Sequence, residues 1–168
     1  VLFNANLKKW VSPEAMAACI DTLTTLNLAS MEAMAGFEIH AVTDVTGFGI
    51  AGHGFEMAAG SGVTLRVRID DLPVMAEALE MYRRGMTTGV NKHIQERVSR
   101  HARFDDGHPD WHRQIVFDPQ TSGGLLVSVA PDRLDELRQA VLAAGALCAA
   151  VVGEVREKPT DGAYLVLN

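Results

Sequence analysis

The chain has 168 residues, of which 48% are hydrophobic, and it carries a formal net charge of -6 at pH 7. This length and apolar fraction suffice for a buried core and predict a single domain over residues 1–168. The acidic balance argues against a broad cationic surface, so we expect neither nucleic acid nor an anionic membrane as a partner. The first residue is Val1 instead of Met, which indicates a chain cut from a longer protein.

We expect a cytoplasmic protein, because no apolar run reaches membrane-spanning length and the amino end does not resemble a signal peptide. The two cysteines, Cys19 and Cys148, stand among alanines and aliphatic residues. This setting favours two buried, reduced thiols over a disulfide.

The first half of the chain is predicted to alternate helices and strands. Ser12, Pro13 and Glu14 are typical of a helix start, since they supply a hydroxyl cap, a proline at the first helical position and an acid in the first turn. The predicted elements are a helix over 13–29 with Met16, Ile20 and Leu23 inward, a strand over 39–42, a helix over 50–59 and a strand over 63–69.

Residues 70–73, with the sequence Asp-Asp-Leu-Pro, are interpreted as the cap of a further helix. That helix would turn Met75, Leu79 and Tyr82 inward and end at Gly85. The alternative is that the paired aspartates bind a metal, and capping explains them more simply.

Residues 92–112 show no sustained periodicity and are expected to be mostly irregular surface. They hold a group of side chains that a metal could use: His101, His108, His112, Asp105, Asp106 and Asp110. We do not expect a metal cluster there, because Pro109 places His108 outside any helix and separates it from a helical zinc motif.

The last third is predicted to contain strands around one more helix. The expected elements are a short apolar run over 115–117, a strand over 125–129, a helix from Pro131 to Gly145, and strands over 149–155 and 164–167 joined by a turn over 159–162. The order of helices and strands is too irregular for a doubly wound sheet, so we expect an α+β fold with a mixed β-sheet covered by helices.

The stretch over residues 43–49, Thr-Asp-Val-Thr-Gly-Phe-Gly, is the centre of the functional argument. It follows the apolar run of a strand and precedes a helical pattern, so Asp44 stands beside the backbone N–H groups of a helix start. This corner suits a metal together with a phosphate. The plainer interpretation is a tight turn at Gly47 and Gly49 with Asp44 as a cap. The flanking His40 and His53 are expected to be partly buried hydrogen-bonding groups.

Two phrases together resemble one family. Residues 40–49, HAVTDVTGFG, are followed by Gly52 and His53, and residues 118–126 read DPQTSGGLL. In this order they resemble the carboxyl-terminal domain of selenophosphate synthetases, also called selenide, water dikinases, and residues 24–27, TTLN, are similar to the same family. The likeness covers nearly the whole chain, whereas the wider aminoimidazole ribonucleotide synthetase superfamily shares only parts of these phrases.

This resemblance implies the carboxyl-terminal half of an ATP-using phosphotransferase that makes selenophosphate from selenide, ATP and water, with AMP and phosphate as co-products. An absent amino-terminal ATP-binding domain would supply the reactive Cys or selenocysteine and most ligands of ATP and Mg²⁺. No catalytic residue is expected in this fragment, which would be inactive alone. By position, Asp44 matches the family's metal-binding aspartate from this half. Thr46, Gly47 and Gly49 are candidate contacts to phosphate oxygens.

The loop over residues 86–91 departs from the family pattern. The family tends to have Pro-Gly-Gly-Thr before an Asn, where this chain has Met86-Thr87-Thr88-Gly89-Val90-Asn91. Two other readings stay open. The chain could come from another enzyme of the superfamily, in purine biosynthesis, thiamine monophosphate phosphorylation or hydrogenase maturation. It could instead be a non-catalytic module that packs on a partner domain or forms a homodimer through Leu2, Phe3 and Trp10.

Overall fold

The computed structural model describes residues 1–105, 107–160 and 162–168. Its α-helices are α1 (Leu2–Leu7), α2 (Pro13–Thr24), α3 (Leu28–Met34), α4 (Gly49–Ser61), α5 (Ala78–Arg83), α6 (Asn91–Val98), α7 (Asp110–Arg113) and α8 (Leu134–Ala143). Short 3₁₀ helices are η1 (Ile69–Asp71), η2 (Gln114–Phe117) and η3 (Pro131–Arg133). The strands are β1 (Ile39–Asp44), β2 (Val63–Val67), β3 (Ala102–Phe104), β4 (Leu125–Val129), β5 (Gly153–Glu157) and β6 (Leu165–Leu167).

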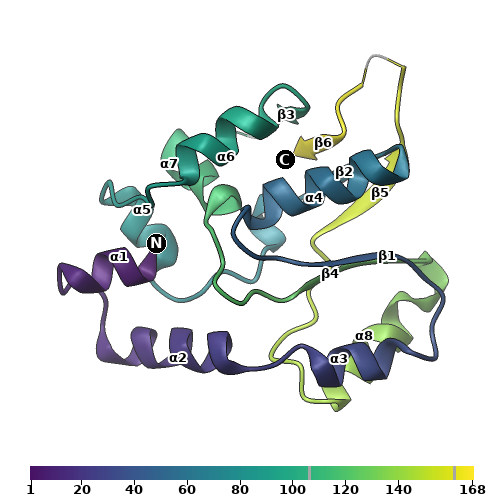
Figure 1. Ribbon diagram of the computed structural model, residues 1–168, viewed down its shortest axis with the longest axis horizontal. Coiled ribbons are helices and arrows are strands. Elements are labelled where there is room, and N and C mark those ends of the chain that lie inside the picture. Colours follow the sequence, from purple (N-terminus) through teal and green to yellow (C-terminus); the bar gives the residue numbers. More distant parts are fainter. Residues whose placement is uncertain (106, 161) are drawn as a thin grey trace.

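In the described part of the chain, the strands form two separate sheets. β1 and β4 pair antiparallel in a two-stranded ribbon, with Asp44 opposite Leu125 at one end. The other sheet has the order β3-β6-β2-β5, in which β2 is antiparallel to β5 and parallel to β6. Helices α3 and α8 lie together on one side of the ribbon and α4 lies on the other (Figure 1). The predicted α+β class with a mixed sheet is therefore confirmed.

Two groups of buried residues hold the chain together. The larger group lies between α4, the four-stranded sheet and η2, and its fully buried members include Val67, Val116, Phe117 and Leu165. The smaller group joins α1, α2 and α5. Leu2 belongs to this smaller group and is only 4% exposed, so it does not mark an open surface, whereas Phe3 is 50% exposed. No helix in the described part of the chain is long and apolar enough to cross a membrane.

The predicted helix over residues 13–29 is wrong at its carboxyl end, over residues 25–29. α2 ends at Thr24, and Thr25 has extended backbone before α3 begins at Leu28. The hydroxyl group of Thr25 donates to a backbone carbonyl of the preceding turn at 2.8 Å, and such local bonds compete with helix continuation. The inward stripe also differs, since Ile20 is exposed.

The start predicted for the next helix, with residues 70–73 as its cap, is also wrong. Asp70 lies in η1 instead, and the α-helix begins only at Ala78. Glu77, the residue before this helix, has a φ of 66°. Its carboxylate accepts hydrogen bonds from the hydroxyl group and from the backbone N–H of Ser12. This contact with the start of α2 comes from tertiary structure, so no local pattern revealed it.

Residues 92–112 are more regular than expected. They contain all of β3 and most of α6 and α7, and buried Ile94 and Val98 lie four residues apart on α6. The polar residues around Ile94 and Val98 made this short apolar face undetectable as a helical pattern in the sequence. The last strands are shorter than predicted or shifted, since β5 begins at Gly153 and β6 at Leu165, and residues 115–117 form part of η2. Part of the predicted turn over 159–162 lies outside the described residues.

Two predictions about single side chains are wrong. Cys19 is buried, which raises the pKa of its thiol, but Cys148 is exposed. His40 is exposed instead of partly buried, because it lies on the outward face of β1. Cys148 and His40 have apolar neighbours in sequence, but these neighbours do not indicate whether the side chain faces the core or solvent.

Candidate functional site

Asp44 ends β1 with its side chain exposed. Alternate residues of β1 face outward, and Val42 and Asp44 share the exposed face. Among the described residues no cationic side chain lies within ion-pairing distance of the Asp44 carboxylate. The structure therefore presents an open anionic group at the end of the β1–β4 ribbon.

The two sequence phrases lie side by side in the structure. The Val45 N–H donates to the Gly124 carbonyl at 2.9 Å, and the Gly123 N–H donates to the Val45 carbonyl at 3.0 Å. The Gln120 N–H donates to the Thr46 carbonyl at 3.0 Å. A Cβ atom on Gly123 would lie 2.1 Å from the Val45 carbonyl oxygen, so this approach requires glycine.

Gly49 shapes the turn into α4. Its φ is 62°, and an added Cβ would lie 2.9 Å from the carbonyl oxygen of Val116. Its N–H donates to the Thr46 carbonyl at 3.0 Å, which closes the turn. Gly47 differs, because it is exposed and an added Cβ would meet no atom within 4 Å. The open side of the turn is therefore at Gly47.

His53 supports this turn from the first part of α4. Its Nε2 lies 3.1 Å from the Thr46 hydroxyl, and its Nδ1 lies 3.4 Å from a carboxylate oxygen of Glu56. Its ring centroid is 5.5 Å from that of Phe48, and the Arg97 guanidinium lies over the Phe48 ring at 4.6 Å from the ring centroid. The side chain of His53 is 12% exposed, which confirms the expected partly buried hydrogen-bonding role.

Asp118, the acid of the second phrase, is buried and fully engaged. It is 7% exposed, and its Oδ1 accepts hydrogen bonds from the Val1 nitrogen at 2.7 Å and from the Tyr82 hydroxyl at 2.9 Å. Burial raises the pKa of Tyr82, and the Asp118 charge raises it further. Asp118 therefore binds internal groups of the chain and does not face solvent.

The network continues through Asn91, at the end of the loop that departs from the family pattern. Asn91 is 1% exposed, and its Nδ2 donates to the Tyr82 hydroxyl at 3.0 Å and to the Gln114 carbonyl at 3.1 Å. The Thr88 hydroxyl donates to the Asn91 side-chain oxygen. Sequence reasoning missed this network, since Tyr82, Asn91 and Asp118 are distant along the chain.

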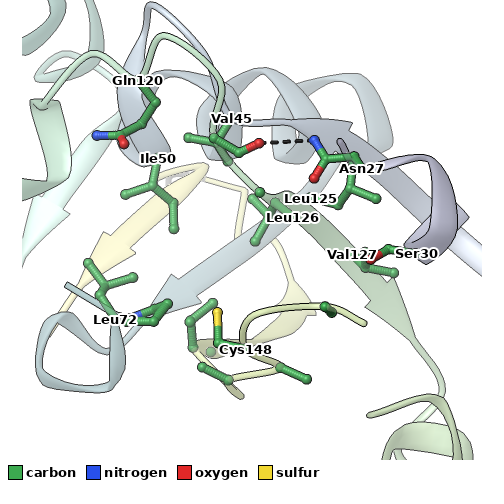
Figure 2. A pocket seen from close by; sticks show the side chains of 18 of the residues that line it. Asn27, Ser30, Val45, Ile50, Leu72, Gln120, Leu125, Leu126, Val127 and Cys148 are labelled. Carbon is green, nitrogen blue, oxygen red and sulfur yellow. Dashed lines mark hydrogen bonds between the residues drawn. The ribbon is translucent and has the colours of Figure 1, made fainter. Parts of the chain in front are cut away.

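A cavity of about 1220 Å³ lies beside the joined phrases. Figure 2 shows Val45, Gln120 and Leu126 on one part of its wall and Cys148 on another. Asn27, from the turn between α2 and α3, donates to the Gly123 carbonyl at 3.0 Å at its edge. The lining is mostly aliphatic, and neither Asp44 nor Gly47 belongs to it. The open carboxylate is therefore separate from this apolar interior.

Comparison with known proteins places residues 6–166 in one domain family, described as AIR synthase related protein, C-terminal domain. The chain is 37% identical over 153 residues to a selenide, water dikinase of Rhizobium meliloti, which covers 90% of this chain and 44% of that protein. It is 41% identical over 142 residues to a selenide, water dikinase of Pelobacter propionicus, and this match covers 84% of this chain and 41% of that protein. A selenide, water dikinase 2 of Peptoclostridium acidaminophilum is 41% identical over 143 residues, and this match covers 83% of this chain and 40% of that protein. The chain thus spans less than half the length of these relatives.

Proposed function

The chain belongs to the family of AIR synthase related proteins as a carboxyl-terminal domain, and from this premise we propose that it forms the carboxyl-terminal half of a selenide, water dikinase. The whole protein would use ATP, selenide and water to make selenophosphate, AMP and phosphate. The observation that carries the proposal is the exposed Asp44 carboxylate, which ends β1 beside the joined phrases.

The surroundings of Asp44 fit a magnesium ion. Mg²⁺ prefers oxygen ligands and usually takes one or two protein carboxylates together with water and phosphate oxygens. Asp44 offers one carboxylate that is exposed to solvent and has no cationic partner among the described residues. When bound, the ion would neutralise charge that develops on the transferred phosphoryl group. In this proposal Asp44 holds the ion at the end of the ribbon.

The residues of the turn take different parts in the proposed site. Gly47 leaves room for a phosphate group, because it is exposed and no atom stands where a side chain would begin. The carbonyl of Thr46 accepts two backbone hydrogen bonds, from Gly49 and Gln120, and its hydroxyl group contacts His53. Thr46 and Gly49 therefore hold the shape of the turn, and Gly47 provides the approach for phosphate oxygens.

The other parts of the site would come from outside these 168 residues. One carboxylate cannot hold a nucleotide with its metal, so an amino-terminal ATP-binding domain would supply the nucleophile and the other ligands. The relatives have room for such a domain, because this chain covers only 40% to 44% of their length. We propose that residues 1–168 form one domain, and that this domain completes the ATP-binding cleft of a cytoplasmic enzyme.

The test is selenide-dependent ATP consumption by the full-length protein that carries this chain. Asp44→Asn keeps the size of the side chain but removes its charge. We expect the rate to fall at least about a hundredfold, the scale at which loss of one preorganised electrostatic contact acts on a transition state.

Glu38→Gln is the matched control, because Glu38 is exposed and immediately precedes β1, at the far end of the strand from Asp44. It should leave the rate within about twofold, since isolated surface substitutions perturb little. An Asp44→Asn protein with normal selenide-dependent turnover would remove Asp44 from the mechanism. A wild-type protein that consumes ATP but ignores selenide would overturn the proposed substrate.

A further inference from the structure

One carboxylate and two imidazoles converge at a second place in the molecule. The potential ligand atoms of Asp70, His108 and His112 all lie within 4.8 Å of one another. His108 Nε2 lies 3.3 Å from Asp70 Oδ1, and the ring centroids of His108 and His112 are 4.2 Å apart. Asp70 lies in η1, His108 just before the N-cap of α7 and His112 within α7, so the cluster is separate from the β1–α4 turn.

Backbone structure brings the two histidines together. Pro109 is the N-cap of α7 and has extended backbone, with a ψ of 156°, so the chain bends just after His108. The His112 N–H donates to the Pro109 carbonyl at 2.9 Å, which fixes the first turn of the helix. The ring of Trp111 stacks on that of His112 at 5.3 Å. The proline that separates His108 from the helix thus allows its ring to meet that of His112.

Asp70 is held beside them by the end of β2. Ile69, which precedes it, is 1% exposed, and its N–H donates to the Asn168 carbonyl at 2.7 Å. The neighbouring Asp71 pairs with Arg68, so it is engaged elsewhere. The Asp70 side chain is 71% exposed and can rotate towards an ion at little cost in packing.

We propose that Asp70, His108 and His112 bind a divalent transition-metal ion such as Zn²⁺. Zn²⁺ accepts imidazole nitrogen and carboxylate oxygen at about 2.0–2.2 Å, so neighbouring ligand atoms of a tetrahedral site are roughly 3.3–3.6 Å apart. The separation of His108 Nε2 and Asp70 Oδ1, 3.3 Å, already matches this geometry.

The donor set separates this site from the one at Asp44. Imidazole suits Zn²⁺, Cu²⁺ and Ni²⁺, whereas Mg²⁺ takes an all-oxygen shell. Three protein ligands leave a fourth position for water or an incoming ligand. Bound to the folded state, the ion would tie η1 to α7 and stabilise the chain by mass action.

Neighbouring charges permit a cation here. The Arg113 guanidinium lies over the Phe104 ring at 5.2 Å and within 3.5 Å of Asp110. The charges of Arg113 and Arg68 are thus both balanced by aspartates. His101 does not join the cluster, because its ring stacks on Phe55 with a centroid distance of 4.8 Å.

The test is a calorimetric titration of the tag-free chain with Zn²⁺ alone. We expect one ion per chain, and at least about a tenfold loss of affinity in His108→Gln and in His112→Gln, because even outer-shell changes cost that much at metal sites. Co²⁺ in place of Zn²⁺ should give a visible absorption band that both variants lose. Asp70→Asn, an exposed change that should leave folding intact, provides the same readout if either histidine variant fails to fold.

Two controls separate the site from adventitious binding. His93→Gln changes a histidine that is 78% exposed on α6, and Cys148→Ser removes the exposed thiol. Both should retain the wild-type affinity. Failure of the wild-type chain to bind Zn²⁺, or unchanged affinity in all three ligand variants, would overturn the proposal. The test involves neither ATP nor selenide, so its result is independent of the proposed enzyme activity.

Discussion

Asp44 and Asp118 have similar settings in sequence and opposite settings in structure. Each follows a short apolar run and precedes hydroxyl residues and glycines. Asp44 is exposed, with no cationic partner among the described residues, whereas Asp118 is 7% exposed and accepts hydrogen bonds from Val1 and Tyr82. Backbone hydrogen bonds nevertheless join the two phrases.

The difference shows how one kind of residue serves two purposes. A buried carboxylate must be paired and hydrogen-bonded, because removing its charge from water is costly. Asp118 meets that requirement with groups of the chain itself and thereby joins the start of α1 to α5. Asp44 keeps its hydration and its capacity to bind an ion. We therefore expect Asp118 to control stability and Asp44 to control activity.

The largest expected effect is on stability at Asp118. Asp118→Ala leaves the buried Tyr82 hydroxyl without its acceptor. We expect the free energy of unfolding to fall by about 3 kcal/mol, the upper end of the scale for leaving a buried hydrogen-bond donor unsatisfied. Urea unfolding followed by circular dichroism measures it.

Asp44→Ala is the matched comparison for this measurement. It should change the free energy of unfolding by no more than about 0.5 kcal/mol, because the removed group is exposed. Equal losses in the two variants would contradict the division between a structural and a functional aspartate.

The next largest effect should be at the turn between the two phrases. Gly49→Ala forces a side chain into a backbone with φ of 62° and to within 2.9 Å of the Val116 carbonyl oxygen. Left-handed backbone and overpacking each cost a residue about 1–2 kcal/mol or more, so we expect a combined loss of at least about 2 kcal/mol in thermal unfolding.

Gly47→Ala is the control, because Gly47 has no left-handed backbone and an added Cβ atom would meet no atom within 4 Å. Its melting temperature should be close to that of the wild-type chain. A Gly47→Ala protein with normal stability but weaker ATP turnover in the full-length enzyme would support the proposed approach of phosphate at Gly47. If Gly49→Ala proved as stable as Gly47→Ala, the described turn would be incorrect.

The smallest expected effect is at Tyr82. Tyr82→Phe removes a hydroxyl that joins Asp118 to Asn91 and should lower the free energy of unfolding by about 1 kcal/mol at pH 7. Burial first, and the Asp118 charge second, raise the pKa of Tyr82 above its ordinary value of 10.0.

This raised pKa gives the Tyr82 effect a direction with pH. Above about pH 10 the unfolded chain releases the phenolic proton while the folded chain keeps it, so wild-type stability falls as pH rises. Tyr82→Phe lacks this titration, and the gap between the two proteins should narrow between pH 9 and about pH 11 in denaturant titrations. A gap that widens over that range would contradict the buried, protonated phenol.

The sequence predicted those parts of the site that depend on local pattern. The run of apolar residues, the acid and the glycines around Asp44 indicated strand, turn and helix, and the structure has β1, the turn at Gly49 and α4 in that order. β2 and β4 were also located, since their apolar residues are contiguous or alternate. The two phrases indicated a family by resemblance, but their pairing through backbone hydrogen bonds was not predicted.

Short elements and isolated polar residues were predicted less well. Asp70 was assigned to a helix cap, and its position beside His108 and His112 depends on how β2 and α7 pack in space. The α6 helix was missed because only two of its apolar residues, Ile94 and Val98, are buried among charged neighbours. In both cases the decisive contacts join segments that are distant along the chain.

The sequence by itself determined the α+β class, the strand–turn–helix around Asp44 and the need for glycine in that turn, because these depend on neighbours within a few residues. Only the tertiary structure decided which aspartate is buried, which is exposed and which lies beside two imidazoles. The physical reason is that hydration, pairing and coordination of a charge depend on groups brought near it by the fold, and those groups lie far away in sequence.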